Sequence, residues 1–448
     1  MAGEVLASTS TKSWLYHPVF PEYWEPRALY SLAKWVNGLA FRDIQFSPTG
    51  KPVIKIAEIK GGISGQTKFT EQVFDESVHL RKGDLLFSWS GQPETSIDVF
   101  WWRGADGWLN QHTFRVTPIE GIDPTFFFYL LRYLKPCFIG IARNKQTTGL
   151  GHVTKRDLEN IEAAYPRLPE QHAIAHILGT LDDKIDLNRR MNKTLEAKAR
   201  AFFKSWFVDF DPVRAKAEGR EPGLPKPLAD LFPDFFEYSE LREIPNAWKF
   251  APLPEVIDVN PTRALRKGVE APYLDMANMP TLGHSPDKVV DRVFGSGMRF
   301  VNGDTLVARI TPCLENGKTA FVDFLDAGEV GWGSTEYIVL RSKPPLPDEF
   351  TYCLARSTEF RDFAIQRMTG SSGRQRVPAE SLSHFPVVVV PKPVAELFGR
   401  LIKPLFARAS AATKENRFLA SLRDTLLPKL FSGELRVKDA ERIIGNRI

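Results

Sequence analysis

The sequence predicts a mixed α+β protein made of two tandem copies of one unit, each a globular domain followed by a long helix. Three observations predict this architecture. The chain repeats itself at an offset close to half its length, the first part of each copy holds short strand-like runs, and the second part holds a heptad pattern. A chain of 448 residues has room for this arrangement, since domains usually take roughly 100–200 residues each.

The repeat appears as a series of matching positions in the same order in both halves. Most matches lie 224 residues apart, and those in between lie 220 apart. The clearest pairs are Trp24 with Trp248, Pro52 with Pro272, Gly83 with Gly303, Val153 with Val377, and Leu158 with Leu382. Each match alone is weak, but their shared order along the chain predicts a pseudo-twofold internal repeat.

The first part of each copy is predicted to be globular. Runs such as 53–59 and 84–89 are short, apolar and bounded by Gly, Pro or Asp, which is typical of strands, and 124–134 has helical character. Residues 209–244 contain several prolines and are predicted to be a linker that returns the chain to the second globular domain.

The second part of each copy is predicted to be a single long helix with a heptad seam. The first seam consists of Ile174, Leu178, Leu181, Ile185, Asn188, Asn192, Leu195, Ala199, Phe202 and Trp206. The second seam, 224 residues later, consists of Phe398, Ile402, Leu405, Ala409, Ala412, Asn416, Leu419, Arg423, Leu426 and Leu430. Pro404 is expected to kink the second helix or delay its start.

Two matching narrow seams most simply pack on one another as a coiled coil, although each helix could instead be the amphipathic face of a separate bundle. Asn192 and Asn416 occupy seam positions, where a polar side chain costs stability but fixes the register. A helix of this length spans roughly 57 Å, which exceeds one turn of duplex DNA at about 34–36 Å. The pair is therefore expected to act as a spacer between two globular domains.

Composition excludes several classes of protein. With 43% hydrophobic and 25% charged residues the chain is neither disordered nor fibrous, and its longest apolar runs, 126–131 and 385–390, are too short to span a membrane. The N-terminus lacks the pattern of a signal peptide, and three distant cysteines fit neither disulfides nor a zinc site, so a cytoplasmic protein is expected. A net charge of +5 permits a nucleic-acid partner.

Catalytic motifs are missing. The chain has no Asn/Asp-Pro-Pro-aromatic loop, no phosphate-binding loop ending in Gly-Lys-Ser/Thr and no convincing nuclease site. His172 and His176 have helical spacing, but no glutamate follows the first histidine and no third ligand is suggested, so no metal site is predicted. The sequence therefore predicts a protein that is not an enzyme.

Polar loops are the best candidates for DNA contacts, because Arg and Gln suit base edges whereas Lys, Ser and Thr suit phosphates. The candidate side chains are Arg143, Lys145, Gln146, Thr147 and Thr148 in the first copy, and Arg309, Arg367, Ser371, Ser372, Arg374, Gln375 and Arg376 in the second. Arg309 is expected to correspond to a position near Trp89. The alternative is that these are ordinary solvated loops, but their polar residues differ while the surrounding positions repeat, as expected if the two domains read different sequences.

Several segments resemble the specificity subunit of type I DNA restriction–modification systems. The similarity is strongest in LPEQHAIA (168–175) leading into LDDKIDLNRR (181–190), in WFVDFDPVRAK (206–216) and in LLPKLFSGEL (426–435). The IPNAW segment at 244–248 also resembles the family, and the similarity extends roughly from Pro21 to Leu435.

The resemblance implies two target-recognition domains that read the halves of an asymmetric, interrupted sequence in double-stranded DNA. It also implies that the long helices pack antiparallel and dock two modification (methyltransferase) subunits, with restriction (motor-nuclease) subunits joining for cleavage. S-adenosylmethionine, ATP and Mg²⁺ are then expected in those partners and not in this chain. The recognised bases and the spacer length do not follow from the sequence.

The expected boundaries combine the repeat with this resemblance. They are an N-terminal tail at 1–20, recognition domains at 21–168 and 245–392, spacer helices at 169–208 and 393–433, the linker at 209–244, and a C-terminal tail at 434–448. Two other classes stay open. An architectural or regulatory DNA-binding protein would bind specific DNA tightly by itself, and a fused enzyme would need a catalytic domain for which no residues remain.

Overall fold

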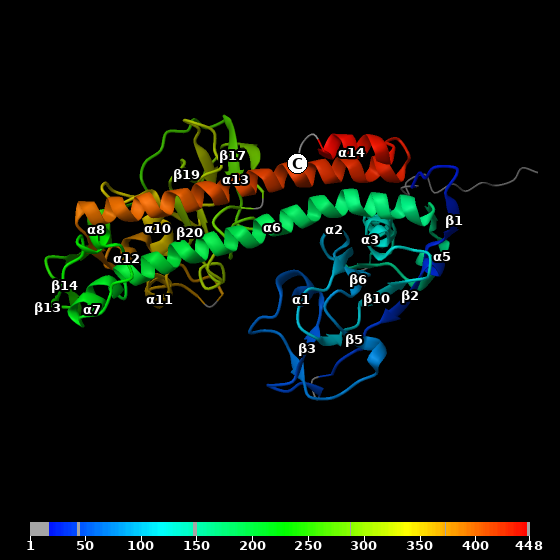
Figure 1. Cartoon of the computed structure of the whole chain (residues 1–448), viewed down its shortest axis with the longest axis horizontal. Helices are drawn as coiled ribbons and strands as arrows, with labels where there is room; N and C mark the ends of the chain where they lie inside the picture. The colour runs from blue at the N-terminus through cyan, green and yellow to red at the C-terminus, as the bar shows by residue number, and fades with distance from the viewer. Residues whose placement is uncertain (1–17, 43–44, 147–149, 287, 372, 446–448) are drawn as a thin grey trace, which may run out of the picture. The chain divides into compact units, whose positions relative to one another are not determined.

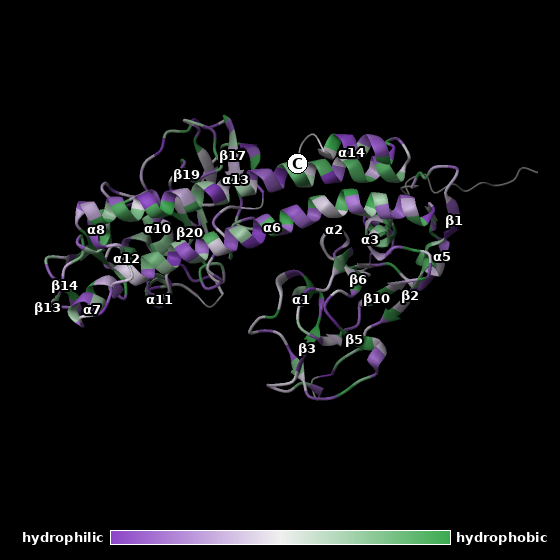
Figure 2. Cartoon of the chain, viewed as in Figure 1, coloured by the Kyte–Doolittle hydropathy of each residue, from purple (hydrophilic) through white to green (hydrophobic). Residues whose placement is uncertain are grey.

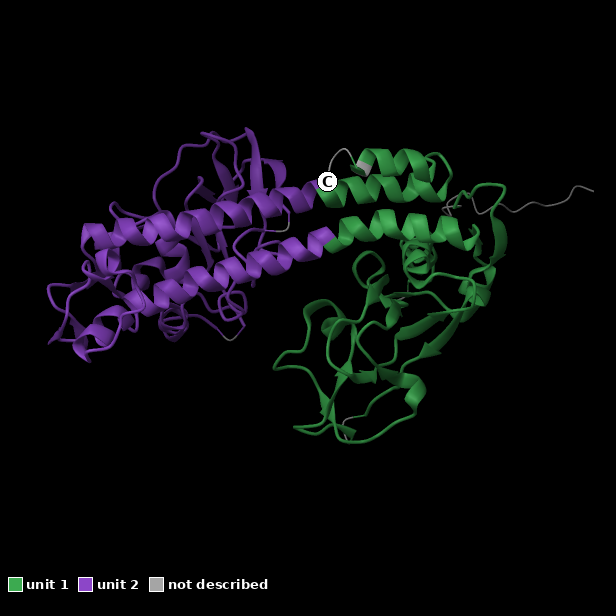
Figure 3. Cartoon of the chain, in the orientation of Figure 1, with its two compact units in different colours: residues 1–183, 419–448 green, residues 184–418 purple. Residues whose placement is uncertain are grey.

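The computed structural model describes residues 18–42, 45–146, 150–286, 288–371 and 373–445. It divides into two compact units, unit 1 (1–183 with 419–448) and unit 2 (184–418), which Figure 3 shows in different colours. Each unit therefore combines a globular domain with segments of both long helices, and the chain belongs to the mixed α+β class that the sequence predicts (Figure 1).

Unit 1 contains two four-stranded sheets and two smaller strand pairs. The first sheet is antiparallel, in the order β2 (Ala33–Asn37), β10 (Thr113–Pro118), β6 (Leu85–Ser88) and β8 (Asp98–Trp101). The second is mixed, in the order β4 (Phe69–Thr70), β3 (Lys51–Ile54), β9 (Gly107–Leu109) and β5 (His79–Leu80). The strand pairs are β1 (Glu25–Ala28) with β12 (Glu162–Tyr165), and β7 (Ser90–Gly91) with β11 (Gly151–His152).

Short helices complete the globular part of unit 1. They are α1 (Ile56–Gly61), α2 (Pro93–Ser96), α3 (Pro124–Tyr133), α4 (Lys135–Asn144) and α5 (Lys155–Asn160), with 3-10 turns η1 (Leu29–Leu32) and η3 (Glu76–Val78). Asp123 caps α3 by accepting a hydrogen bond from the Phe126 amide, and Pro124 suits the first helical turn. Almost all of α3 is buried, so this helix forms part of the core of unit 1.

Unit 2 repeats this plan. Its antiparallel sheet has the order β16 (Ile257–Val259), β23 (Tyr337–Ser342), β20 (Thr305–Ala308) and β21 (Thr319–Phe321), and its mixed sheet has the order β18 (Val290–Val293), β17 (Glu270–Leu274), β22 (Gly331–Gly333) and β19 (Met298–Phe300). The strand pair is β15 (Lys249–Pro252) with β24 (Pro386–Val389). The helices are α9 (Leu253–Val256), α10 (Asp348–Ala355), α11 (Thr358–Gln366) and α12 (Ala379–Leu382).

The strand register confirms the internal repeat. In unit 1 Val116 pairs with Leu85 and Thr113 with Ser88, whereas in unit 2 Leu340 pairs with Thr305 and Tyr337 with Ala308. These partners differ by the offsets of 224 and 220 found in the sequence. The parallel pairs agree as well, since Val53 lies opposite Trp108 and Tyr273 lies opposite Trp332. The four-residue difference between the offsets therefore lies in connecting segments and leaves the pairing unchanged.

The long helices are α6 (Leu168–Phe207) and α13 (Lys392–Phe431), each of 40 residues and therefore about 60 Å long. Figure 2 shows hydrophobic and hydrophilic residues alternating along both. In each helix seven of the ten predicted seam residues are buried and the other three are half-buried. The two helices pack antiparallel within each unit, since residues near 182 lie against 423 in unit 1 and residues 188–192 lie against 416–409 in unit 2.

Pro404 does not delay the second helix, contrary to expectation. The helix begins at Lys392 and continues through the proline. Pro404 is exposed, and the backbone hydrogen bond that it cannot make would end on Arg400, an exposed residue whose carbonyl can turn to water. Buried neighbours such as Phe406 hold this part of the helix in place by packing.

Polar side chains join the helices at defined points of the seam. In unit 1 Arg423 forms an ion pair with Asp182, which also accepts a hydrogen bond of 2.7 Å from the Tyr129 hydroxyl. In unit 2 the Asn188 amide donates to Asn416 Oδ1 at 3.0 Å and to Glu415 Oε2 at 2.7 Å.

Asn192 also bonds across the helix pair. Its amide nitrogen donates to the Ala409 carbonyl at 3.1 Å and to Thr413 Oγ1 at 3.0 Å. Asn192 and Asn416 therefore do not pair with each other, although each bonds to the opposite helix. Their role in fixing the register stays a prediction.

The segment 209–244 contains regular structure of its own. It holds α7 (Asp211–Ala217), α8 (Lys226–Ala229) and most of a hairpin formed by β13 (Phe236–Tyr238) and β14 (Glu243–Pro245). Phe210, Val213 and Phe232 are buried in the core of unit 2. This segment thus connects the first long helix to the second domain and also packs on it. A further helix, α14 (Val437–Gly445), follows α13.

Within the described part of the chain, no single helix has the length and apolar character needed to cross a membrane. The pair α3–α4, bent by 49°, meets that requirement by length and composition only.

A buried arginine holds the irregular parts of unit 2 together. The guanidinium of Arg356 donates to the carbonyl oxygens of Thr281 at 2.7 Å, Gly317 at 2.8 Å and Thr319 at 2.8 Å. Its Nε donates to the Tyr352 hydroxyl, which in turn donates to Glu196 on α6 at 2.8 Å. One side chain thus connects α10, strand β21, two loops and the long helix.

We predict that Arg356→Met destabilises the protein by about 3–5 kcal/mol, because it leaves buried carbonyls without donors. Denaturant unfolding followed by circular dichroism measures the change. Arg400→Met is the matched control, since Arg400 is exposed on α13, and it should change stability by no more than about 0.5 kcal/mol. A loss of less than about 1 kcal/mol for Arg356→Met would contradict this role.

Candidate nucleic-acid interface

The predicted DNA-contact loops occupy equivalent places in the two units. In unit 1 the loop follows α4 and leads back to the end of strand β6. In unit 2 the loop follows α11 and leads back to the end of strand β20. The Val153 amide donates to the Trp89 carbonyl at 2.8 Å in unit 1, and the Val377 amide donates to the Arg309 carbonyl at 2.9 Å in unit 2. The predicted correspondence of Arg309 with a position near Trp89 is therefore correct.

The loop of unit 2 forms a narrow turn on the end of strand β20. Thr369 and Arg376 exchange two backbone hydrogen bonds of 2.9 Å, and Gln375 accepts one of 3.0 Å from the Thr311 amide. Between these points the Arg374 amide donates to the Ser371 carbonyl at 3.0 Å. Gly370 has a φ of +120°, which favours glycine. The loop therefore holds its exposed Arg374 and Ser371 on a defined backbone.

Two of the predicted arginines share one carboxylate. Glu336 accepts from Arg309 Nε at 3.2 Å and from Arg376 Nε at 2.9 and 3.0 Å. Both side chains are partly exposed, by 32% for Arg309 and 41% for Arg376. We name Arg309, Glu336 and Arg376 the strand-end cluster of unit 2. It carries a net positive charge, which favours contact with DNA.

Arg367 lies apart from this cluster. Its guanidinium stacks on the Phe363 ring with 3.3 Å between the guanidinium carbon and the ring centroid, and its Nη1 donates to the Phe363 carbonyl at 3.3 Å. The side chain therefore packs on its own helix, α11, which limits its reach.

The candidates of unit 1 are tied more closely to their own domain. Arg143 donates to Glu94 at 2.6 Å in an exposed ion pair, and Lys145 donates to both carboxylate oxygens of Asp157 at 2.6 Å. Gln146 is exposed. The remaining candidates, Thr147 and Thr148 in this loop and Ser372 in unit 2, lie outside the described residues.

The Lys145–Asp157 pair stabilises the start of α5. Asp157 also accepts hydrogen bonds from the Thr154 amide at 2.7 Å and the Thr154 hydroxyl at 2.6 Å, which completes a capping box. Burial alone would raise the pKa of Asp157, but the hydrogen bonds from Lys145 and Thr154 outweigh it and hold the pKa below its ordinary value. Lys145 therefore contributes to the fold as well as being a candidate for phosphate contact.

Sequence reasoning pointed to the region of Trp89 but missed the side chains that lie around it at the equivalent strand end of unit 1. The Trp89 indole N–H donates to Asn37 Oδ1 at 2.9 Å, and the rings of Trp89 and His112 lie 5.1 Å apart. The Trp89 amide donates to the His112 carbonyl at 3.1 Å, as the Arg309 amide does to the Glu336 carbonyl at 3.0 Å. We name Asn37, Trp89 and His112 the strand-end cluster of unit 1. Only the 224-residue offset between His112 and Glu336 could have pointed to it.

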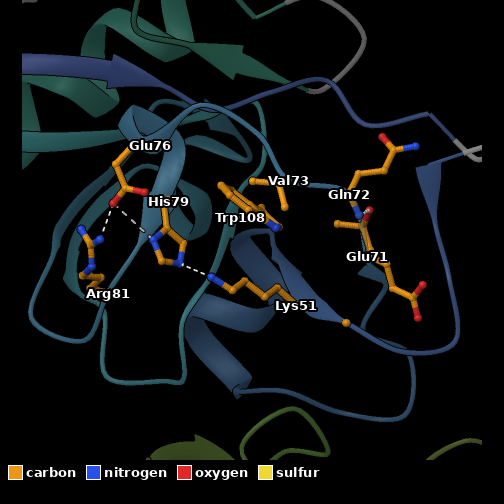
Figure 4. A pocket seen from close by; sticks show the side chains of 10 residues that line it. Lys51, Glu71, Gln72, Val73, Glu76, His79, Arg81 and Trp108 are labelled. Carbon is orange, nitrogen blue, oxygen red and sulfur yellow. Dashed lines mark hydrogen bonds and ion pairs between the residues drawn. The ribbon is translucent and has the colours of Figure 1, made fainter.

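A cavity of about 380 Å³ lies beside the mixed sheet of unit 1 (Figure 4). His79 Nε2 lies 2.8 Å from Lys51 Nζ, and Lys51 also lies over the Trp108 ring at 5.3 Å. Arg81 forms an ion pair with Glu76. The cationic groups of this cavity are thus engaged with neighbours in their own domain, and no candidate from the sequence lies in it.

A family model described as the type I restriction modification DNA specificity domain matches residues 21–197. This match covers the first globular domain and most of α6. Residues 21–197 therefore form a domain of this kind, and the chain as a whole is similar to type I restriction–modification specificity subunits.

Similarity to individual relatives extends over both halves of the chain. The HindI specificity subunit of Haemophilus influenzae is 26% identical over 416 residues, covering 80% of this chain and 87% of that protein. The MjaIX specificity subunit of Methanocaldococcus jannaschii is 25% identical over 445 residues, covering 87% and 94%. The crystal structure of a type I S subunit from M. genitalium has the same fold, with a TM-score of 0.50 at 16% identity, covering 93% of this chain and 99% of that one.

The lowered pKa of Asp157 predicts a pH dependence. Because its pKa is lower in the folded than in the unfolded state, its contribution is fully present above the unfolded value near 3.8 and is lost as pH falls through the folded value. The difference in unfolding free energy between the wild type and Asp157→Asn should thus be constant near neutral pH and shrink below about pH 4. Urea titrations at several pH values measure it, and a difference that grew on acidification would contradict the assignment.

Proposed function

We propose that this specificity subunit directs a type I restriction–modification complex to its DNA target, and that each globular domain reads one half of an interrupted sequence. One observation carries the proposal. The two domains share a backbone framework down to single hydrogen bonds, yet the side chains at its equivalent strand-end positions differ, with Trp89, His112 and His152 in one and Arg309, Glu336 and Arg376 in the other. A common scaffold with different contact chemistry suits two unlike half-sites.

The helix pair is proposed to set the distance between the half-sites and to dock two modification subunits. Quasi-equivalent segments of α6 and α13 offer quasi-equivalent surfaces, which supports two copies of one partner. Those subunits would supply S-adenosylmethionine-dependent adenine methylation, and restriction subunits would supply ATP- and Mg²⁺-dependent cleavage. The chain itself would be a DNA-recognition subunit without catalytic residues, acting in the cytoplasm where its target DNA is found.

A bipartite regulatory DNA-binding protein is the alternative, and DNA affinity separates the two. A specificity subunit needs its modification partner for full affinity, whereas a regulatory protein binds its site tightly by itself.

We predict that the subunit, expressed with its modification partner, places methyl-adenine at one interrupted two-part motif. Sequencing of methylated bases in cells with and without the pair identifies the motif. Replacing residues 245–391 by the corresponding segment of another specificity subunit should change one half of that motif and leave the other half unchanged. A change in both halves would show that the domains do not read independently.

We also predict that removing one heptad from each long helix shortens the non-specific spacer of the motif. Deleting 189–195 from α6 and 409–415 from α13 keeps Asn188 opposite Asn416 and removes about 10 Å of helix, equivalent to about three base pairs. Methylation mapping should show both halves unchanged with fewer bases between them. An unchanged spacer, or an altered half-site, would contradict the spacer role. Deleting the α6 segment alone is the control and should abolish assembly, since the two seams would no longer match.

A further inference from the structure

We infer that the two domains recognise different kinds of base pair through their strand-end clusters: unit 1 reads an A·T pair with Asn37, and unit 2 reads a G·C pair with Arg376. The inference rests on the proposed function and assigns the chemistry of each half-site. It follows from the hydrogen-bond donors and acceptors of these side chains that remain after their contacts within the described residues are counted.

The two clusters lie at equivalent strand ends, where Trp89 and His112 correspond to Arg309 and Glu336, whereas Asn37 comes from the neighbouring strand β2 and Arg376 corresponds to His152. In unit 2 Arg376 lies opposite Ile310 at the end of strand β20, and in unit 1 His152 lies opposite Ser90 at the end of strand β6. These pairs differ by the same offsets of 224 and 220 as the rest of the scaffold. A DNA edge that meets one strand end would therefore meet the equivalent strand end in a similar orientation, and the side chains around each strand end would decide which base pair is read.

Arg376 presents a free end of its guanidinium. Its Nε is used by Glu336, and one hydrogen of Nη1 is used by the Arg374 carbonyl at 3.1 Å. An arginine has five N–H donors, so one hydrogen on Nη1 and both on Nη2 have no partner among the described residues. Two donors side by side on a planar group match the O6 and N7 acceptors of guanine.

Glu336 holds the guanidinium group of Arg376 in a fixed orientation. Its two oxygens both lie within 3.0 Å of Arg376 Nε, and Arg309 Nε holds the carboxylate from the other side at 3.2 Å. An arginine held along its stem loses less conformational entropy on binding than a free one, and this favours a specific contact over a loose phosphate contact. Arg309 therefore positions the carboxylate, and Arg376 is the reading residue.

The Asn37 side chain is an amide and therefore offers a hydrogen-bond acceptor next to a donor. The indole N–H of Trp89 can only donate, so the atom that it contacts at 2.9 Å must be the Asn37 oxygen, and this fixes the orientation of the amide. The Asn37 nitrogen donates to the Gly38 carbonyl at 3.2 Å. One lone pair of Oδ1 and one hydrogen of Nδ2 remain, on an exposed side chain. An acceptor next to a donor matches the edge of adenine in the major groove, where N6 donates a hydrogen bond and N7 accepts one.

The surroundings of Asn37 support an A·T pair. Trp89 and His112 place aromatic surface beside the amide, which suits the methyl group of thymine. Glu336 is replaced here by His112, and Arg376 by His152, so no arginine belongs to this cluster. In the major groove guanine offers two acceptors and no donor, so it would leave the Asn37 oxygen without a hydrogen-bond partner.

The test is methylation mapping of the assembled modification complex carrying Arg376→Gln. We expect one G·C position, in one half only, to relax or to change towards A·T, because glutamine pairs with adenine as arginine pairs with guanine. Discrimination at that position should fall roughly 5- to 150-fold, as expected for one bidentate contact. Arg292→Gln is the matched control, since Arg292 is an exposed arginine of the same unit that stacks on Tyr273 in the other sheet, and it should leave the motif unchanged.

Asn37→Ala is the corresponding change in unit 1. It should relax one A·T position in the opposite half, whereas Asn160→Ala, an exposed asparagine at the end of α5, should change nothing. If a variant abolishes methylation, competition binding of the purified complex to sites substituted at single base pairs replaces the mapping.

The inference is overturned if the affected positions are A·T for Arg376 or G·C for Asn37, if both variants alter the same half, or if neither alters the motif. A wild-type complex that assembles but methylates no two-part motif would instead overturn the proposed function.

Discussion

The antiparallel pairing of α6 and α13 is the interaction on which both units depend, because each helix completes the core of both. In unit 1 Phe431, from the end of the second helix, packs against Trp24 and Phe126 with ring centroids 5.8 and 5.2 Å apart. In unit 2 Phe207, from the end of the first helix, packs against Phe398 at 4.9 Å. Neither domain closes its hydrophobic core with its own half of the sequence. The spacer and the domains are therefore one folded structure and not separable modules.

The polar contacts in the seam are predicted to select one register of this pairing. Apolar side chains at heptad positions pack almost equally well after a shift of one heptad. The Asn188–Asn416 bond, the Asn192–Thr413 bond and the Asp182–Arg423 ion pair would all be lost by such a shift, and buried polar groups without partners are costly. Tyr129 extends this selection into unit 1, since its hydroxyl donates to Asp182. Hydrogen bonds and one ion pair in the seam are thus predicted to fix the register of the two helices.

Much of this architecture could be predicted from the sequence, because both of its main signals are periodic. The 224-residue repeat predicts equivalent sheets, and the heptads predict the helix pair with its buried positions. Short strands such as β4 and β7 could not be predicted, since two residues carry no pattern and exist through long-range pairing. The structure of 209–244 was missed because its prolines resemble a linker, while single residues such as Phe210 and Phe232 complete the core.

The candidate interface was predicted only in outline. Loop composition pointed to the right segments, but it could not show that Lys145 is bound to Asp157 or that Arg309 and Arg376 share Glu336, because those partners lie 12–40 residues away in the sequence. The contact between Asn37 and Trp89 escaped notice for the same reason. A single asparagine and a single tryptophan are ordinary until strand pairing places them together.

The interleaving of the helices also constrains when the protein can fold. Phe431 is synthesised some 300 residues or more after Phe126, yet it packs on Trp24, Phe126 and Tyr133 in unit 1. A nascent chain must therefore carry the first domain with an open apolar face until residue 431 has left the ribosome, whereas the second domain is synthesised after the helix on which it packs. Contacts between such distant segments are slow to form and leave apolar surface open to aggregation. The N-terminal domain is thus the last to be completed, and premature termination anywhere before residue 431 leaves it unfinished.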